Sequence, residues 1–371
     1  MRVVVTGGAG FIGSHLVDAL VKEGHEVRVL DSLDAQVHEG RKPDYLNSRA
    51  EYCWGDVRDR ALLRKTLQGA EVVFHEAAAV GVGQSMYQIE KYVSINTLGT
   101  ATLLDVIIND RLIPKKLLVA SSMSIYGEGQ YRCPRCGVVC PSLRTEAQLQ
   151  QREWEMHCPS CDSLVAPEGT PETKLLAPTS VYAVSKRDQE ELCLSVGRGY
   201  HIPTVALRYF NVYGPRQALS NPYTGVCAIF SARIKNGNSP LIFEDGKQSR
   251  DFIHVSDIVQ ANLLAMKSPK ADDEVLNVGT GRASSVVQIA ETLAQLYERP
   301  VKPTLVQKFR AGDIRHCYAE ISKIRRLLGF QPRVRLEDGL RDLVAWGRQA
   351  AAEDRVEQAA QELEARGLTQ G

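Results

Sequence analysis

Tyr182 and Lys186 stand four residues apart in the stretch Tyr182-Ala-Val-Ser-Lys186. On a helix, residues at i and i+4 share a face, so the phenol and the ammonium would be neighbours. A free tyrosine has a pKa of about 10, and a nearby ammonium stabilises its phenolate. To act as a base near neutral pH, its pKa would have to fall by roughly 3 units, or about 4 kcal/mol. The pair is therefore a candidate for proton removal from a hydroxyl coupled to hydride transfer; the alternative is an ordinary exposed helix face.

Three glycines near the amino terminus indicate a dinucleotide site. Gly7, Gly10 and Gly13 lie between an apolar strand, Val3–Thr6, and a predicted helix, Phe11–Glu23. Glycines at such a turn let backbone amides approach a pyrophosphate at the start of the helix. Together with the Tyr-x-x-x-Lys pair, this turn predicts a nicotinamide cofactor.

An acidic residue at the end of the next predicted strand indicates which cofactor binds. Asp31 follows Glu26–Leu30 and lies 18 positions beyond Gly13. Its carboxylate suits the hydroxyls of an adenosine ribose and would repel a 2′-phosphate, which predicts NAD rather than NADP. Asp56 follows a third strand, Tyr52–Trp54, where it either contacts the adenine amino group or caps the next helix.

The elements that position these residues form an α/β pattern. Strands alternate with helices over the first 210 residues, which predicts a Rossmann-type doubly wound parallel sheet. The other strands are Val72–His75, Lys116–Ala120 and Thr204–Arg208, and the clearest later helices are Asn96–Asn109 and Val181–Val196. Residues 1–210 are thus expected to bind NAD, and residues 211–349 to form mainly a smaller substrate lobe at the carboxyl ends of the strands. Residues 350–371 are expected to form a mostly polar helical tail, exposed to solvent or at a subunit contact.

Two Cys-x-x-Cys pairs interrupt the first domain. Cys133 and Cys136 form one pair, and Cys158 and Cys161 the other, with 21 residues between the pairs. Two such pairs are typical of a tetrahedral zinc ribbon with four cysteine ligands, and disulfides or loose thiols are the alternative. We predict that the insertion, residues 131–171, holds one structural zinc and flanks the catalytic pocket or builds a subunit contact.

Several further motifs resemble those of the extended short-chain dehydrogenase/reductase family, specifically its nucleotide-sugar epimerases and dehydratases. The resemblance runs from Met1 to about Phe330, apart from the insertion. The motifs that carry it are Thr6-Gly-Gly-Ala-Gly-Phe-Ile-Gly13, His75-Glu-Ala-Ala78, Asn96, Ser121-Ser122, Tyr182-x-x-x-Lys186, Arg208-Tyr-Phe-Asn211, Arg250-Asp-Phe-Ile-His254-Val-x-Asp257, Asn277-Val-Gly-x-Gly281 and Gly312-Asp-x-Arg315. The insertion and Gly81-Val-Gly-Gln-Ser85 are most similar to dTDP-L-rhamnose 4-epimerase-type proteins.

The resemblance implies roles for individual residues. Tyr182 is the expected base, Lys186 holds the nicotinamide ribose and tunes that base, and Ser122 orders the sugar hydroxyl. Cofactor contacts are implied for Gly7, Gly10, Phe11, Ile12, Gly13, Asp31, Asp56, Val57, Ala77, Ala78, Asn96, Tyr182 and Lys186. Substrate contacts are implied for Ser122, Asn211, Arg250 and Arg315, the two arginines at the diphosphate. His75 is expected to be structural.

The residues after Ser122 indicate the reaction. Sugar 4,6-dehydratases of the family resemble Thr-Asp-Glu here, because elimination of water needs a further acid and base. Met123 and Ser124 cannot supply them. The resemblance therefore implies an NAD-dependent nucleotide-sugar 4-epimerase. Tyr182 would remove the C4 hydroxyl proton while hydride moves to NAD, and hydride would return to the opposite face of a 4-keto sugar. The suggested sugars are dTDP-L-rhamnose and dTDP-6-deoxy-L-talose.

Other functions remain as alternatives. An NDP-hexulose reductase of the same fold would consume NADPH, and Asp31 argues against NADPH. A 4,6-dehydratase would need the additional acid and base that this chain lacks after Ser122. A non-catalytic dinucleotide-sensing scaffold, whose ribbon grips nucleic acid, would need a basic surface. The sequence between Cys133 and Cys161 contains three arginines and three glutamates, so the ribbon is balanced in charge.

Composition excludes several classes of partner. The chain has 371 residues, 44% hydrophobic and 24% charged, with a net charge of +1, so neither nucleic acid nor a membrane surface is an expected partner. We expect no signal peptide or membrane span, and nine scattered cysteines favour a cytoplasmic location. A homodimer is expected through the helices Asn96–Asn109 and Val181–Val196, as in relatives. The apolar residues expected to supply that interface are Leu103, Leu104, Val106, Ile107, Leu192, Leu194 and Val196.

Overall fold

A seven-stranded parallel sheet forms the centre of the computed structural model, which describes residues 1–310 and 312–370. Its strand order is β14-β9-β5-β4-β1-β2-β3, the doubly wound arrangement expected from the sequence. The strands are β1 (Arg2–Thr6), β2 (Glu26–Asp31), β3 (Glu51–Trp54), β4 (Val72–His75), β5 (Lys116–Ser122), β9 (Thr204–Tyr209) and β14 (Val275–Val278). Six were predicted to within two residues, whereas β14 lies in the segment that was expected to belong mainly to the substrate lobe.

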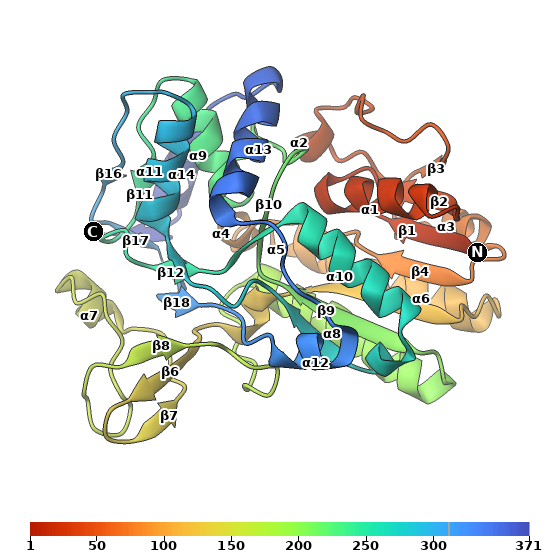
Figure 1. Cartoon of the computed structure of the whole chain (residues 1–371), viewed down its shortest axis with the longest axis horizontal. Coiled ribbons are helices and arrows are strands. Elements are labelled where there is room, and N and C mark those ends of the chain that lie inside the picture. Colours follow the sequence, from red (N-terminus) through yellow and green to blue (C-terminus); the bar gives the residue numbers. More distant parts are fainter. Residues whose placement is uncertain (311, 371) are drawn as a thin grey trace.

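Helices cover both faces of this sheet (Figure 1). One face carries α1 (Phe11–Lys22), α10 (Val255–Lys267) and α12 (Ser322–Leu328); the other carries α3 (Arg60–Leu67), α6 (Gly99–Asn109) and α8 (Val181–Tyr200). Successive strand residues point to opposite faces, so Val3 and Val5 join the first core while Val4 joins the second. The strands are therefore held by buried apolar side chains on both faces of the sheet.

The apolar residues expected to form a dimer face belong instead to the second core. Leu103, Leu104, Val106, Ile107 and Leu194 are buried within this chain, and Leu192 and Val196 pack partly against them. The expectation that these side chains exceed the needs of one core is therefore wrong. Exposed apolar side chains do occur nearby, on α5 (Ile89–Tyr92), the following π-helical turn (Val93–Leu98) and α8. They are Ile89, Val93, Leu98 and Val184.

A second lobe lies beyond the carboxyl ends of the strands. Its core is formed by α9 (Val226–Lys235), α11 (Val286–Leu296) and α13 (Leu336–Gln349). Small sheets pair β10 (Asn211–Tyr213) with β13 (Phe252–His254), β11 (Leu241–Ile242) with β16 (Thr304–Leu305), and β12 (Ser249–Arg250) with β15 (Ser284–Ser285) and β18 (His316–Cys317). Short helices fill the connections: α2 (Ala35–His38), α4 (Val82–Ser85) and two 3-10 turns, Met123–Tyr126 and Pro269–Ala271.

The four-cysteine insertion (residues 131–171) leaves the sheet after β5 and returns before α8. It contains β6 (Gln130–Cys133), β7 (Gly137–Val139), α7 (Glu146–Gln150) and β8 (Ala166–Glu168). Figure 1 shows its three strands apart from the central sheet, on the side away from β1 to β3. Its own core is small: Tyr131, Cys133, Met156, Cys158 and Val165.

The C-terminal segment is not a simple solvated tail. It forms α14 (Val356–Ala365) and β19 (Thr369–Gln370), which pairs antiparallel with β17 (Phe309–Arg310). Ala359 and Leu363 are buried, although the sequence of this segment is rich in charged residues. The expectation of solvent exposure is therefore wrong for the inner face of α14.

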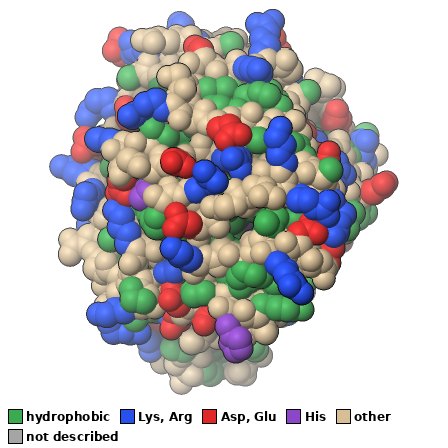
Figure 2. Space-filling view, turned by 90° about the vertical axis from the view of Figure 1, so that its right-hand side faces the viewer, with side chains coloured by type: hydrophobic (Ala, Val, Ile, Leu, Met, Phe, Trp, Pro, Cys, Tyr) green, Lys and Arg blue, Asp and Glu red, His purple; other side chains and the backbone are tan. Residues whose placement is uncertain are grey.

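Charged side chains are mixed rather than segregated on the face drawn in Figure 2. Lysine and arginine side chains lie among aspartate and glutamate side chains there, in keeping with the net charge of +1. The helices that the structure describes include none with the length and hydropathy of a membrane span.

Candidate active site

One large cavity lies between the carboxyl ends of the strands and the second lobe. Its volume is about 1340 Å³, whereas a pocket for a single small ligand measures roughly 300–1,000 Å³. The lining begins at the glycine turn after β1, passes Ser122 and Tyr182, and reaches the second lobe and α14. The cavity therefore has room for a dinucleotide and a second ligand.

The glycine turn forms a cradle that larger residues would fill. Gly7 has φ +71°, and a Cβ there would lie 2.8 Å from the Ala77 amide nitrogen. A Cβ on Gly13 would lie 2.2 Å from the Gly7 carbonyl oxygen, so α1 can approach the turn only because this residue is glycine. Gly10 precedes α1 without a side-chain cap among the described residues. The first-turn amides, which line the cavity, therefore suit a pyrophosphate.

The acidic residues after β2 and β3 both line the cavity. The Asp31 carboxylate accepts hydrogen bonds from the Ala9 amide at 3.0 Å and the Leu33 amide at 2.8 Å, which fixes it at the strand end. Asp56 is held by Arg58, which lowers the pKa of its carboxyl group through a side-chain hydrogen bond. The helix cap that Asp56 was also considered for is Asp59, which accepts from the Leu62 amide.

Most of the other cofactor candidates line the same cavity. They are Phe11, Ile12, Val57, Ala77 and Ala78. Asn96 does not line it, because its side chain is buried and bonded to both the amide and the carbonyl of Ala79 and to Ser185. Its place is behind the loop that follows β4, which it holds in position.

The structure brings Ser122, Tyr182 and Lys186 to one wall of the cavity. Ser122 ends β5, and α8 begins beside it with Ser180 as the N-cap. The Tyr182 amide donates to the Ser85 hydroxyl at 3.0 Å, which ties the start of α8 to the loop after β4. Burial raises the pKa of Tyr182, and a side-chain hydrogen bond with Ser122 opposes this rise.

Lys186 does not act on the phenol in the way expected. Its ammonium donates to the Ala120 carbonyl and to Gln189 Oε1, the latter at 2.8 Å. Burial lowers its pKa to about 8. The expected lowering of the Tyr182 pKa by this lysine is therefore absent, because the ammonium is engaged by those two oxygens and desolvation dominates at Tyr182.

Glu76 is a titratable residue of the cavity that was not among the predicted site residues. Its carboxylate accepts from the Tyr209 hydroxyl at 2.8 Å, and burial raises its pKa to about 7. The charge of Lys186 favours the ionised form of Glu76. The sequence signal for this residue was an acidic side chain directly after an apolar strand, in the stretch His75-Glu-Ala-Ala78.

His75 is structural, as expected. Its ring nitrogens contact the Thr6 and Thr100 hydroxyls, each at 2.8 Å, and burial lowers its pKa to about 3. The ring is therefore neutral and joins β4 to β1 and α6.

The structure separates the two arginines expected at the diphosphate. Arg250 lines the cavity, while Arg315 is fully buried and pairs with Glu155, Glu244 and Asp245. A guanidinium enclosed by three carboxylates is not free to bind phosphate, so the structure contradicts the expected contact of Arg315 with the diphosphate.

Two other residues offer polar groups to a ligand in this region. Arg310 lines the cavity, lies over the Phe243 ring and pairs with Asp313. It was not predicted, although it stands only two positions before the motif that begins at Gly312. Asn211 also lines the cavity, and its Oδ1 is buried with no hydrogen-bond partner among the described residues. An unpaired buried oxygen is costly, so this atom marks a place for a ligand donor.

The four cysteines of the insertion form one cluster. Cys133, Cys136, Cys158 and Cys161 have all their sulfur atoms within 4.8 Å of one another, and Cys133 and Cys161 are 3.5 Å apart. Tetrahedral zinc with Zn–S bonds of about 2.3 Å requires sulfur separations of roughly 3.8 Å. The donor set and its spacing therefore fit a structural zinc.

Comparison with known proteins agrees with the fold. The family model for NAD dependent epimerase/dehydratase matches residues 3–139 and 150–279, and its gap lies inside the four-cysteine insertion. A dTDP-L-rhamnose 4-epimerase from Burkholderia thailandensis is 32% identical, and the match covers 93% of this chain and 94% of that protein. The chain therefore belongs to the NAD-dependent epimerase/dehydratase family.

Solved structures show the same architecture with ligands. A UDP-glucose 4-epimerase from Thermotoga maritima with UDP-glucose has a TM-score of 0.77 at 32% identity, covering 94% of this chain and 99% of that one. A UDP-glucose 4-epimerase from Thermus thermophilus in complex with NAD has a TM-score of 0.74 at 29% identity, covering 95% and 100%. The protein is thus an enzyme of a family whose members act on nucleotide sugars.

Proposed function

We propose that the protein is an NAD-dependent nucleotide-sugar 4-epimerase. The observation that carries the proposal is the placement of Ser122, Tyr182 and Lys186 on one wall of a cavity large enough for a dinucleotide and a nucleotide sugar. Met123 and Ser124 occupy the positions of the additional acid and base of a dehydratase, and Ser124 donates to Ser122 at 2.9 Å. That contact helps to orient the Ser122 hydroxyl.

Each residue of the site has its own proposed role in the epimerisation. Bound NAD would accept a hydride from C4 of the sugar and return it. Ser122 orders the C4 hydroxyl, and Tyr182 removes its proton and later gives it back. Lys186 must leave the Ala120 carbonyl and turn its ammonium toward the ribose and the phenol, because only then does its charge favour the phenolate. Asn211 and the arginines Arg250 and Arg310 hold the nucleotide diphosphate.

The proposed sugars are dTDP-L-rhamnose and dTDP-6-deoxy-L-talose. Support comes from the relative from Burkholderia thailandensis, a dTDP-L-rhamnose 4-epimerase that matches along nearly the whole chain. An NDP-hexulose reductase and a 4,6-dehydratase are the alternatives within the fold.

Isotope labelling separates these reactions. We expect purified protein to carry bound NAD and to interconvert C4 epimers without added reductant, with deuterium at C4 retained in the product. A reductase would need one equivalent of NAD(P)H per turnover, and a dehydratase would incorporate solvent hydrogen. A non-catalytic dinucleotide sensor would bind NAD and leave every nucleotide sugar unchanged.

We further propose that the four-cysteine cluster holds one zinc and that the chain forms a homodimer in the cytoplasm. The spacing of the four sulfur atoms supports the metal. The exposed side chains of Ile89, Val93, Leu98 and Val184 support a dimer face on α5, the π-helical turn and α8. Light scattering tests the dimer: Val93→Asp should yield monomers, whereas a wild-type monomer at micromolar concentration would contradict it.

A further inference from the structure

The C-terminal strap (residues 353–370) is attached to the second lobe at both ends and contacts the dinucleotide half (residues 1–210) between them. Asp354 pairs with the buried Arg233 of α9 at 3.2 Å, which fixes the start of the strap on the second lobe. At its other end β19 pairs with β17, whose Arg310 lines the cavity. Between these two attachments α14 lies against the cavity and supplies part of its wall.

A single carboxylate joins the strap to both lobes. Glu362 accepts hydrogen bonds from Tyr87, in the dinucleotide half, and from Tyr223, in the second lobe, both at 2.8 Å. The two hydroxyl oxygens lie 2.6 Å apart, and the Arg366 guanidinium lies over the Tyr87 ring. The strap is thereby held across the cavity by contacts to both sides.

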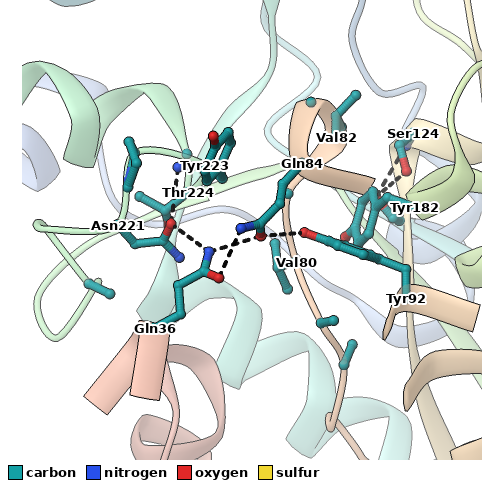
Figure 3. A pocket seen from close by; sticks show the side chains of 18 of the residues that line it. Gln36, Val80, Val82, Gln84, Tyr92, Ser124, Tyr182, Asn221, Tyr223 and Thr224 are labelled. Atoms are coloured by element: carbon teal, nitrogen blue, oxygen red, sulfur yellow. Dashed lines mark hydrogen bonds between the residues drawn. The ribbon is translucent and has the colours of Figure 1, made fainter. Parts of the chain in front are cut away.

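Leu363 lies beside the turn that precedes Ser85, whose hydroxyl accepts from the Tyr182 amide. Its methyl carbons lie 3.5 Å from the place where a Cβ on Gly83 would be. Gly83 belongs to α4, which ends at Ser85, and the Ser85 hydroxyl accepts from the amide of Tyr182. Figure 3 shows the surroundings of this turn, with Gln84 bonded to Tyr92 and Gln36.

The cavity-lining side chains of the strap are mainly apolar. Val356, Ala359, Ala360, Leu363 and Leu368 line the cavity, together with Glu364 and Thr369. Two cations near this wall are already engaged: Lys308 pairs with Glu364 at 3.0 Å, and Arg366 lies on the Tyr87 ring. A sugar carboxylate placed against this wall would lose water without gaining a partner, and a methyl group would gain apolar contacts.

We propose that α14 is the wall of the sugar subsite and that Leu363 makes the enzyme select a neutral 6-deoxyhexose over hexoses bearing a C6 hydroxymethyl or carboxylate. This inference rests on the proposed 4-epimerase function and specifies its substrate class. A methyl group at C6 is apolar, whereas a carboxylate at C6 is charged. The reacting C4 is the same in all these sugars, so the wall affects which sugar binds and not the chemical step.

The test uses nucleotide sugars that share one nucleotide and differ only at C6, as methyl, hydroxymethyl or carboxylate, in both the L-manno and D-gluco series. Affinities are measured by calorimetry in full-length NAD-loaded protein carrying Tyr182→Phe, so that binding is read without turnover. We expect the methyl compound to bind roughly 10-fold more tightly than the hydroxymethyl compound and the carboxylate to bind least. Leu363→Ala should bring the methyl and hydroxymethyl affinities to within about 2-fold of each other.

Matched variants separate selection from damage to the fold. Leu363→Met keeps an apolar side chain of similar volume and should retain the preference. Gln361→Ala changes an exposed residue of the same helix and should leave all affinities unchanged. Unaltered ratios in Leu363→Ala protein with normal NAD content, or tightest binding of the carboxylate, would overturn the inference. Failure of the proposed function is a different result: wild-type protein would bind the sugars without interconverting them.

Discussion

Two buried or half-buried carboxylates in different regions of the molecule respond to their surroundings in opposite ways. In the dinucleotide half, burial raises the pKa of Glu76 to about 7. In the four-cysteine insertion, a hydrogen bond with His316, together with Arg315, lowers the pKa of Glu155 to about 2. The first carboxylate titrates near neutrality beside Lys186, and the second stays ionised within a network of ion pairs.

The difference shows how the two regions are stabilised. The dinucleotide half has large apolar cores on both faces of its sheet, and these can offset a poorly paired charge near the site. The insertion has a core of only a few side chains and depends on its cysteines and on charge pairs such as Arg144 with Glu244 at 2.8 Å. Chemistry is therefore expected to reside in the first region and positional support in the second.

The largest effect should come from removing the base in the dinucleotide half. Tyr182→Phe should lower turnover by about 10²–10⁴-fold, because general-base catalysis is lost. NAD content and the resistance of the insertion to proteolysis should stay at wild-type values. Turnover near the wild-type rate would refute the assignment of Tyr182 as the base.

Loss of the metal should have the reverse pattern. Cys158→Ser, or removal of zinc by a chelator, should loosen residues 131–171, since zinc can contribute about 10–16 kcal/mol to ordering a small module. The loosened insertion would release Glu155 from Arg315 and weaken sugar binding by roughly 10-fold, while NAD remains bound. Elemental analysis and limited proteolysis provide the measurement.

Cys140→Ser is the matched control, because Cys140 is exposed and lies outside the cluster. It should retain zinc and activity. Protein purified without chelator that contains no zinc would show that the metal assignment is mistaken.

Substituting the two carboxylates should change stability with opposite signs. The folded pKa of Glu76 lies above its ordinary value of 4.5, so its contribution to stability falls as pH rises from about 4.5 to about 7, by up to about 3 kcal/mol. Glu76→Gln should thus stabilise the protein at pH 8 relative to its effect at pH 4.5. Urea unfolding at the two pH values gives the comparison.

Glu155→Gln should behave differently. Its lowered pKa means that its contribution is present above pH 4.5 and is lost as pH falls toward 2, so the substitution should destabilise the protein at pH 7. The size should be smaller, because Glu155 is partly exposed and screened by solvent. If both substitutions stabilise the protein at neutral pH, the contrast between the two regions fails.

The smallest effect concerns the choice of cofactor. Asp31→Ser with Leu33→Arg should relax the preference for NAD over NADP by roughly 10-fold, because a carboxylate that repels the 2′-phosphate is replaced by a cation nearby. The insertion should be unaffected. Fluorescence titration with both dinucleotides measures the ratio, and equal affinities in the wild-type protein would show that Asp31 does not set it.

The sequence predicted best where a local pattern determines position. Strands that run into glycine, aspartate or serine placed Gly7, Asp31 and Ser122 at one edge of a parallel sheet, as found. Residues whose role depends on distant partners could not be read this way. Arg315 carries the same charge as Arg250, and only folding reveals that three carboxylates enclose it.

The same limit applies to the helices and the tail. The apolar residues of α6 were expected to provide more apolar surface than one core can bury, but α3 and α8 contact this helix on two sides. Glu362 reads as a solvated charge, yet it bonds to two tyrosines that lie 275 and 139 positions away in the chain. Tertiary pairing over such separations leaves no periodic signal in the sequence.

The antiparallel pairing of Gln130 with Glu168 places the two ends of the four-cysteine insertion side by side. A module that leaves and returns at one point can be exchanged for a short turn during evolution without moving β5 or α8. In this protein such an exchange would remove one ion-pair partner from each of two buried side chains: Glu244 would lose Arg144, and Arg315 would lose Glu155. The chain connections would thus allow the insertion to be removed, but its ion pairs with the second lobe would not. A variant without the insertion would also need replacements for the second-lobe residues that pair with it.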